Sequence, residues 1–323
     1  MRTPSGDPLT VSVVMPTYNR RQAVCRVVEI LLVDPSIHEI VVVVDGCRDG
    51  TIEALEERAE TDTRLRPTFV DNGGEGLARQ RAAQGATGDV LLVLDDDVEP
   101  APGLASGHLR HHLETPGLVV LGYMPTEVPE PRHPGCFATA LYAREYEAVT
   151  RQWDSDPTLI FSSFWAGNFS IRREDALLVG FAAPERFPYH EDQVFGFRCR
   201  EAGLSARFDR SLLARHEHSR TFDAFVSDAQ RQGEGAWMIH QRYGGGPFPF
   251  VDERPFPAMV QRLIRIGASN RSRRMVQGIL RMVVRASGRA HLFAVETYSA
   301  MVLRSIVQRE KISGLEFEES HHR

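Results

Sequence analysis

Three adjacent aspartates, Asp95, Asp96 and Asp97, are the residues of this sequence whose type and spacing most directly suggest chemistry. They end the apolar run in LLVLDDDVEP, and like charges this close repel one another unless a cation neutralises them. On an extended strand alternate side chains share a face, so Asp95 and Asp97 are predicted to face one point while Asp96 turns away or bonds locally. Paired carboxylates bind hard divalent cations that keep water and share phosphate oxygens. The cluster therefore predicts a divalent-cation site, with a solvated acidic turn as the alternative.

Polar residues also follow two earlier apolar runs. Thr17, Tyr18 and Asn19 come after VSVVMP, and Asp45 ends the run EIVVVVD. If these runs are strands of one parallel sheet, their carboxyl ends meet at one rim, where open α/β sheets bind ligands. The three aspartates then share this rim with the polar residues that follow the first two strands. The sequence contains neither a glycine-rich dinucleotide motif nor a Walker A motif, so neither of these phosphate loops supplies the binding chemistry.

The elements that must position these residues follow from the apolar periodicity. Continuous apolar runs alternate with segments of helical spacing, which is typical of a parallel sheet covered on both faces. After a proline-rich stretch with one helix at about 138–150, short strands and helices return between 161 and 218. The strands predicted before that stretch are 11–16, 39–46, 65–70 and 89–95, and the helices are 20–33, one that begins near 49, and 76–84.

Composition limits the classes of function. A chain of 323 residues that is 42% hydrophobic can form a substantial core. A net charge of −5 does not indicate a nucleic-acid-binding protein. The four cysteines have neither the spacing of a structural zinc site nor that of a disulfide framework. Because no apolar stretch is long enough for a signal peptide or a spanning helix, we expect reduced thiols and a cytoplasmic protein.

Five ordered motifs together resemble a known family. The chain is similar to glycosyltransferases of the GT-A fold, and to their family 2, over roughly residues 11–219. The resemblance rests on VSVVMPTYNR, VVVVDGCRDGT, NGGEGLARQRAAQGATGDVLLVLDDDVEP, WAGNFSIRRE and HEDQVFGFRCREAG, which occur in the family's order.

The resemblance implies an α/β architecture, the GT-A or nucleotide-diphospho-sugar transferase fold. This fold has an open, mainly parallel, twisted sheet flanked by helices, and here it would carry a helical C-terminal extension. Residues 1–220 would form the catalytic domain, with a nucleotide-binding half at about 10–100 and an acceptor half at about 101–220. Residues 221–323 would form a helical, arginine-rich region.

The resemblance also implies which residues bind the donor. Asp95 and Asp97 would form the DxD motif, the first near the ribose and the second on Mn²⁺ or Mg²⁺ bound to the diphosphate. The residues assigned to nucleotide-sugar binding are Pro16, Thr17, Tyr18, Asn19, Asp45, Asn72, Gly76, Arg79, Asp95 and Asp96.

The motif HEDQVFGFR resembles the family's ED motif, whose aspartate is usually the general base. Family 2 enzymes are generally inverting, so the acceptor hydroxyl attacks opposite the leaving group in one step and needs one positioned base. Asp192 is the first choice for this base and Glu191 the second. The alternative is a pair of acids that stabilises a helix N-terminus through the helix dipole.

Two further groups are assigned with a structural alternative beside each. His216 and His218 end an apolar run at strand spacing, and we expect one of them, His216 before His218, to join the metal ligands; a purely structural role is the alternative. In the motif FWAGNFSIRRE, the resemblance places Trp165, Gly167 and Asn168 on the acceptor side. A core aromatic is the alternative for Trp165.

The C-terminal region has its own charge pattern. Between Arg254 and Arg289 there are nine arginines and no Asp or Glu, interleaved with aliphatic residues at helical spacing. Three interpretations stay open: helices packed on the catalytic domain with solvated arginines, peripheral contact with an anionic membrane surface, and binding of an acidic partner chain.

The sequence thus predicts a metal-dependent, inverting glycosyltransferase, a hexosyl- or pentosyltransferase. It would move a sugar from a nucleotide-diphosphate sugar, with a UDP-sugar favoured, to a hydroxyl of a glycan, a lipid-linked molecule or a natural product. A retaining enzyme of the same fold and a non-catalytic nucleotide-sugar-binding protein are the alternatives. We expect no nucleic-acid partner and a cytoplasmic location, with the inner face of the membrane as the site of any peripheral contact. The sequence is compatible with a homo-oligomer.

Overall fold

The computed structural model describes residues 8–244, 256–269 and 272–322, with the side chains of 114 and 316–322 excepted. Arg254 and Arg271 of the arginine-rich segment lie outside these residues. The chain divides into two compact units. The first comprises Met1–Pro125, Val149–Glu185 and Asp192–Glu217, and the second comprises Thr126–Ala148, Arg186–Glu191 and His218–Arg323.

The first unit is built on one twisted sheet. Within the described residues, eight strands have the order β3-β2-β1-β4-β7-β6-β8-β5. The first four strands in this order are parallel to one another. Of these, β1, β2 and β4 are buried along nearly their whole length, whereas the edge strand β3 is partly exposed. These strands are β1 (Val11–Thr17), β2 (Ile37–Asp45), β3 (Leu65–Val70) and β4 (Val90–Leu94).

Beyond β4 the sheet becomes mixed. β7 (Asn168–Arg172) lies between β4 and β6 (Leu118–Tyr123) and runs antiparallel to both. β8 (Ser205–His216) is parallel to β6, and the short β5 (Val98–Pro100) pairs antiparallel with the end of β8. The predicted α/β fold is confirmed, and its parallel part is β3-β2-β1-β4.

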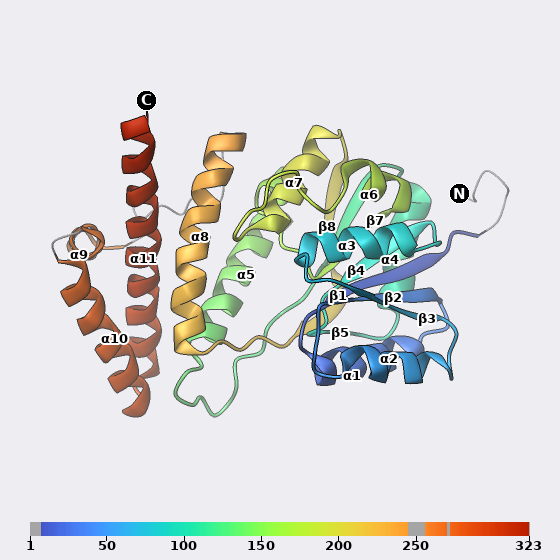
Figure 1. The fold of residues 1–323 in the computed structure, drawn as a ribbon, viewed down its shortest axis with the longest axis horizontal. Helices are drawn as coiled ribbons and strands as arrows, with labels where there is room; N and C mark the ends of the chain where they lie inside the picture. Colours follow the sequence, from blue (N-terminus) through green and yellow to red (C-terminus); the bar gives the residue numbers. More distant parts are fainter. Residues whose placement is uncertain (1–7, 245–255, 270–271, 323) are drawn as a thin grey trace. The chain divides into compact units, whose positions relative to one another are not determined.

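Helices cover both faces of this sheet. Figure 1 shows α1 (Arg21–Leu32) and α2 (Thr51–Ala59) on one face of the β1–β3 strands and α3 (Glu75–Gly85) on the opposite face. The remaining helices of the unit are α4 (Leu104–Glu114), the 3₁₀ helix η1 (Pro157–Ser162), α6 (Arg173–Val179) and α7 (Glu191–Glu201), whose first residue belongs to the second unit.

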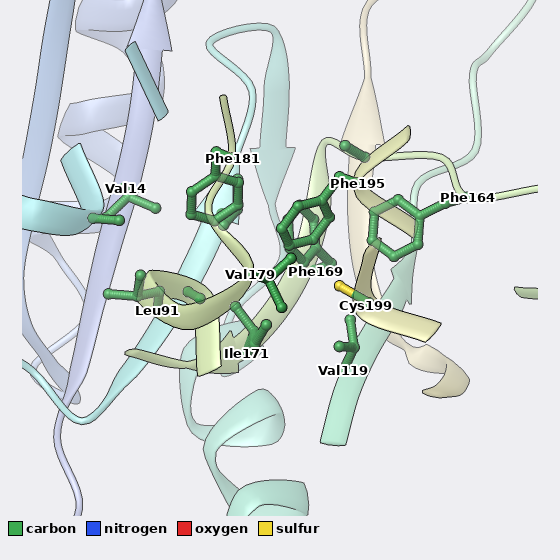
Figure 2. Close-up of a cluster of buried hydrophobic side chains, with 14 of the residues drawn as sticks. Val14, Leu91, Val119, Phe164, Phe169, Ile171, Val179, Phe181, Phe195 and Cys199 are labelled. Carbon is green, nitrogen blue, oxygen red and sulfur yellow. The ribbon is translucent and has the colours of Figure 1, made fainter. Parts of the chain in front are cut away.

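An apolar cluster between the sheet and its helices forms the core of the first unit (Figure 2). The rings of Phe181 and Phe195 stack with centroids 4.8 Å apart, and Phe164 packs edge-on against Phe195 at 5.7 Å. Ile171 and Phe169 of β7 lie in the same cluster. Burial of aromatic rings against Phe169 helps to hold β7 beside β4, and β7 begins at the candidate site.

The second unit is helical. The N-terminal part of α5 (Phe137–Ser155) packs with α8 (Phe222–Tyr243), α10 (Arg273–Arg289) and α11 (Phe293–His322), and α9 (Ala258–Ala268) packs against α10 and α11 (Figure 1). Over the described residues, none of the helices has the combination of length and apolar character that a membrane-spanning helix requires.

The division into units differs from the predicted boundary at residue 220. Residues 126–148 and 186–191 group with the C-terminal helices. The reason is visible in one apolar cluster: Phe137 and Leu141 of α5 pack with Phe225 of α8 and Leu303 of α11. A boundary drawn from sequence order alone could not anticipate this, because α5 precedes β7 and β8 in the chain.

Candidate active site

The three aspartates lie on a turn between β4 and β5 rather than on an extended strand. The turn is fixed through its backbone, because Asp95 N donates to Gly167 O at 3.2 Å and Val98 N donates to Asp95 O at 3.2 Å. The predicted strand alternation is therefore wrong here. The side chain of Asp96 is the most buried of the three, and its Oδ2 accepts a hydrogen bond from Thr17 Oγ1 at 2.7 Å.

Arg20 neutralises two of these acids. Its Nη1 donates to Asp96 Oδ1 at 2.8 Å and also pairs with Asp97 Oδ2. Burial opposes the charged guanidinium, but the Asp97 and Asp96 carboxylates raise the pKa of Arg20 above its ordinary value. Burial raises the pKa of Asp96 to about 6, with Arg20 and Thr17 acting in the opposite direction. Asp96 was predicted to turn away or bond locally. In the structure it is one of the two carboxylates that pair with Arg20.

His216 reaches the same turn through strand pairing. It is the last residue of β8 and lies opposite Val98 of β5, and Glu217 N donates to Asp97 O at 2.9 Å. This register brings His216 Nε2 to 3.6 Å from Asp97 Oδ1. The two side chains, a carboxylate and an imidazole, come from segments more than one hundred residues apart in sequence.

The donors present fit a divalent cation that takes only part of its coordination from protein. Asp97 Oδ1 and His216 Nε2 converge, and a Mg²⁺ or Mn²⁺ ion takes its remaining ligands from water and phosphate oxygens. Among the described residues there is no group of three His, Cys, Asp or Glu side chains arranged to hold a metal. Two protein ligands would leave coordination positions on such an ion for the oxygens of a phosphorylated ligand.

Arg79 connects the acidic turn to α7. Its guanidinium is buried, with Nη2 at 2.7 Å from Asp95 Oδ1 and Nη1 at 3.1 Å from Asp192 Oδ1, and it also pairs with Glu75 of its own helix. The buried Nε has no hydrogen-bond partner among the described residues. The two terminal nitrogens of Arg79 are thus engaged by carboxylates, and a contact of Arg79 with the nucleotide stays a prediction.

Asp192 is held from two sides. Besides the bond from Arg79, its Oδ2 accepts a hydrogen bond from Ala166 N at 3.1 Å. Its side chain keeps 31% of its surface exposed, although both carboxylate oxygens accept hydrogen bonds from the protein. Burial raises the pKa of Asp192, Arg79 lowers it, and the nearby Asp95 raises it again, with a net rise. A carboxylate with a raised pKa is a better proton acceptor near neutral pH than an ordinary aspartate.

The segment Ala166–Asn168 joins Asp95 to Asp192. Gly167 has φ of +114°, and a Cβ there would lie 2.9 Å from both Asp95 Oδ2 and Met124 Sδ, so only glycine fits. Asn168 begins β7, but its side chain is only 1% exposed. Its Oδ1 accepts a hydrogen bond from His108 Nε2 at 3.0 Å, and its Nδ2 donates to Leu212 O at 3.0 Å. The side-chain amide of Asn168 is thus engaged by the protein, and its predicted position near the sugar or acceptor stays a prediction.

Other predicted residues are placed as follows. Trp165 is half-buried and packs against the core cluster of the first unit. Glu191 begins α7 and belongs to the second unit. His218 also belongs to the second unit, where its ring stacks on Tyr142 with centroids 4.3 Å apart. Since β8 ends at His216, the prediction that both histidines share one face of a strand is wrong.

Asp45 closes a loop at the end of β2. Its two carboxylate oxygens accept hydrogen bonds from Gly73 N at 2.8 Å and Gly74 N at 2.9 Å. This places the exposed Asn72 beside Gly46, whose hypothetical Cβ would meet Asn72 Cβ at 2.8 Å. Asp45 therefore orders the loop that leads to Gly76 at the start of α3, and its contact with a ribose stays a prediction.

The residues after β1 form the other side of this rim. Pro16 and Thr17 end the strand, and the exposed Tyr18 and the left-handed Asn19 follow. Asn19 is fixed by Cys47, whose Sγ accepts from Asn19 N at 3.0 Å. The exposed ring of Tyr18 is thus presented from an ordered turn.

Arg20 is the residue that the sequence interpretation missed. It directly follows Asn19 in the motif TYNR, at the same strand end as the predicted binding residues. Two adjacent arginines, Arg20 and Arg21, follow this strand end, and no signal in the sequence says which of them meets the acids. The separation in sequence between Arg20 and Asp96 or Asp97 does not indicate a contact. Only the interatomic distances in the structure place Arg20 beside these acids.

Comparisons with known proteins show the family and the fold of the chain. A family model described as "Glycosyl transferase family 2" matches residues 12–174, just over half of the chain. The glycosyltransferase AglD of Haloferax volcanii is 34% identical over 95 residues, which cover 27% of this chain and 15% of AglD. The putative teichuronic acid biosynthesis glycosyltransferase TuaG of Bacillus subtilis is 33% identical over 89 residues, which cover 27% of this chain and 35% of TuaG. The chain thus spans about a third or less of these curated relatives.

Solved structures share the fold at low identity. The mannosyltransferase PcManGT of Pyrobaculum calidifontis, in complex with GDP-Man and Mn²⁺, superposes with a TM-score of 0.57 and 17% identity, covering 94% of this chain and 87% of that one. Residues 1–349 of S. aureus TarS, in complex with UDP-GlcNAc, give a TM-score of 0.50 and 16% identity, covering 92% of each chain. These likenesses concern the fold, which is GT-A-like. Because the family model matches just over half of the chain, the chain belongs to glycosyl transferase family 2.

Proposed function

We propose that this protein transfers a sugar from a nucleoside-diphosphate sugar to a hydroxyl acceptor, with inversion and with Asp192 as the general base. Family membership supports the reaction class. The single observation that carries the proposal is that Arg79 bridges Asp192 and Asp95, so that a proton acceptor and the acid of the predicted DxD motif share one buried cation.

The donor would bind along the rim formed by the ends of β1, β2 and β4. Tyr18 is exposed there, and Asp45 orders the Gly73–Gly74 turn beside it. We propose that the base and ribose lie against these residues, where a flat aromatic ring can stack on a base and backbone groups can bond a ribose.

A divalent cation, Mn²⁺ or Mg²⁺, would be held by Asp97 and His216 together with diphosphate oxygens. When bound, it would neutralise the charge that develops on the departing diphosphate. The contribution of the chain's own residues is to keep Asp97 Oδ1 and His216 Nε2 facing each other through the β5–β8 pairing.

In the transfer step, the acceptor oxygen forms a bond to the anomeric carbon while the bond from that carbon to the diphosphate oxygen breaks, and the electron pair leaves with the diphosphate. Asp192 accepts the hydroxyl proton on a carboxylate oxygen. Arg79 and Ala166 N hold this carboxylate in one orientation, and positioning of this kind accounts for much of the rate that a general base provides. Gly167, which contacts Asp95, leaves the space beside this acid free of side chain.

The identity of the donor is open to direct measurement. PcManGT was solved with GDP-Man and TarS with UDP-GlcNAc, so both nucleotide classes belong in the screen, and we favour a UDP-sugar. The purified protein is incubated with each nucleotide sugar and Mn²⁺, with and without candidate glycan and lipid-linked acceptors, and free nucleoside diphosphate is measured. Release above background with one donor is the expected result.

Two variants make this experiment specific. Asp97→Ala should abolish metal-dependent release, whereas Asp154→Ala, at a surface ion pair with Arg210, should not change it. Anomeric NMR of the product then distinguishes inversion from retention. If a donor binds but no acceptor leads to release of nucleoside diphosphate, the result would support a non-catalytic binding protein instead. Retention of the anomeric configuration would contradict Asp192 as the single base.

A further inference from the structure

Helix α9 exposes a line of apolar side chains. Met259, Leu263 and Ile266 are spaced at i, i+4 and i+7, and all three are exposed, with Met259 at 80%. Its opposite side packs into the second unit through Ile264. A helix that already buries one apolar face and still presents a second one has not satisfied its hydrophobic surface within the chain.

Helix α10 repeats this pattern. Met275, Ile279 and Met282 also follow i, i+4 and i+7 spacing, with Met275 64% exposed and Met282 63% exposed. Val276 and Val284 of the same helix are buried in the core of the second unit. Two helices of one unit thus each carry an outward apolar line, which we call the α9 line and the α10 line.

Arginines border both lines. Neither α9 nor α10 contains an Asp or a Glu. On α9, Arg262 and Arg265 are exposed beside the apolar line, and on α10 the exposed Arg274, Arg285 and Arg289 repeat at i, i+11 and i+15. In the part of the chain that the structure describes, no ion pair is formed by Arg262, Arg265, Arg274 or Arg289, while Arg285 lies 3.6 Å from the exposed Asp223.

We propose that the α9 and α10 lines bind the surface of a membrane that contains anionic lipids. Methionine, leucine and isoleucine side chains would enter the boundary between headgroups and acyl chains, and the bordering arginines would contact lipid phosphates. An amphipathic helix with low net hydrophobicity, a wide charged side and an apolar line lies in the plane of such a surface. Glycosyl transfer does not depend on this proposal, which rests on the second unit alone.

A second copy of the chain is a poorer fit to the same surface. A two-fold interface brings the same patch of each copy together, so arginines of one helix would face arginines of the other without an acid on α9 or α10 to neutralise them. A nucleic acid would account for the arginines but would leave exposed methionines and isoleucines without a favourable environment. Anionic lipid satisfies both parts of the pattern.

The experiment is cosedimentation of the full chain with vesicles of phosphatidylcholine, alone or with 30% phosphatidylglycerol, a composition chosen as roughly that of an anionic bacterial surface. We expect binding only to the anionic vesicles, and we expect it to weaken as salt rises. Arg262→Gln with Arg265→Gln should reduce partitioning by about tenfold or more, since each basic side chain contributes roughly fivefold near an anionic surface.

Met275→Asn with Ile279→Asn should abolish binding to the anionic vesicles. Leu178→Asn is the control and should not change binding, because Leu178 is an exposed apolar residue on α6 of the first unit, outside both lines. All of these positions are on the surface, so circular dichroism should report an unchanged fold and the nucleotide-release assay an unchanged rate. The proposal is overturned by equal binding to both vesicle types, by no binding to either, by a dimer that these substitutions dissociate, or by salt-sensitive binding to nucleic acid that the Met275/Ile279 variant retains.

Discussion

Arg79 donates a hydrogen bond to Asp192 across 3.1 Å, although the two residues are 113 positions apart in the chain. The same guanidinium binds Asp95 at 2.7 Å, so α3, the acidic turn and α7 meet at one buried cation. A carboxylate oriented in this way before any substrate binds needs little rearrangement to act as a base.

Asp192→Asn should remove transfer and keep donor binding. The amide can still accept a hydrogen bond from Arg79 or Ala166, but it cannot take up a proton, and loss of a general base lowers the rate by about 10²- to 10⁴-fold. Steady-state kinetics measure the rate, and calorimetry with the nucleotide sugar measures binding. Glu191→Gln is the matched control, and a larger loss of kcat in the control than in Asp192→Asn would assign the base to Glu191.

The pH dependence of kcat/KM should reflect the raised pKa of Asp192. A general base works when it is deprotonated, so burial, which raises this pKa, moves the acid limb of kcat/KM to higher pH than the value near 3.9 of an exposed aspartate. Initial rates between pH 4 and pH 9 locate this limb. Arg79→Met removes the cation that lowers the pKa and should move the limb further upward, while Arg79→Lys should move it less. A limb at or below about 3.9 in the wild type would contradict the assignment.

Arg20→Ala should strengthen donor-free binding of Mn²⁺. In the wild type the guanidinium occupies Asp97 Oδ2 and therefore competes with a cation for this carboxylate. We expect at least about tenfold tighter binding, together with about 1 kcal/mol lower stability from the lost, partly exposed ion pairs. Calorimetric titration with Mn²⁺ alone measures the affinity. Arg21→Ala, one residue along the chain, should leave it unchanged, and equal or weaker binding by Arg20→Ala would refute the competition.

Gly167→Ala should disturb the site through steric contact. The added Cβ would lie 2.9 Å from Asp95 Oδ2, and either Asp95 or the backbone must move. Gly203→Ala is the matched control, because Gly203 also has positive φ but its Cβ would have no neighbour within 4 Å. Both variants should lose about 1 kcal/mol from backbone strain, and only Gly167→Ala should lose most of the nucleotide-release activity. Similar activity in the two variants would indicate that the Gly167–Asp95 contact is unimportant.

Glu39→Gln should destabilise the first unit away from the site. Burial alone would raise the pKa of Glu39, but hydrogen bonds from Ser12 and Thr87 and the ion pair with Arg66 lower it to about 2. This stabilisation is complete above the ordinary glutamate pKa and is lost as the pH falls toward 2. At pH 7 the variant should be about 1–3 kcal/mol less stable in urea unfolding, and the difference should shrink below pH 4. Glu29→Gln, at an exposed ion pair with Arg58, is the control and should change stability little.

Local patterns in the sequence predicted the parallel part of the fold well. The apolar runs at 11–16 and 39–46 correspond to β1 and β2, and the helical spacing at 76–84 corresponds to α3. Continuous β-branched runs identify such strands because both faces are buried. The position of β7 between β4 and β6 was not predictable in this way, because periodicity reports which face of a strand is buried and says nothing about its neighbours.

The candidate site likewise has features that the sequence predicted and features that it did not. The motifs predicted the three aspartates, Asp192 and His216 as site residues, and their roles stay predictions. They did not indicate that Arg20 and Arg79 would occupy those acids, or that the amide of Asn168 would be used up by His108 and Leu212. These are tertiary contacts between residues far apart in sequence, and one chain without coordinates contains no signal for them.

The pairing of β5 with β8 restricts where residues can be inserted into or deleted from the chain. Asp95 O bonds Val98 N, Asp97 O bonds Glu217 N, and Val98 lies opposite His216, so every residue from Asp95 to Val98 has a fixed partner or position. One inserted or deleted residue would shift the register by one position and turn Asp97 away from His216. Loop grafting or domain insertion in this protein should therefore avoid residues 95–98, a short connection in which Asp96 and Val98 are also buried.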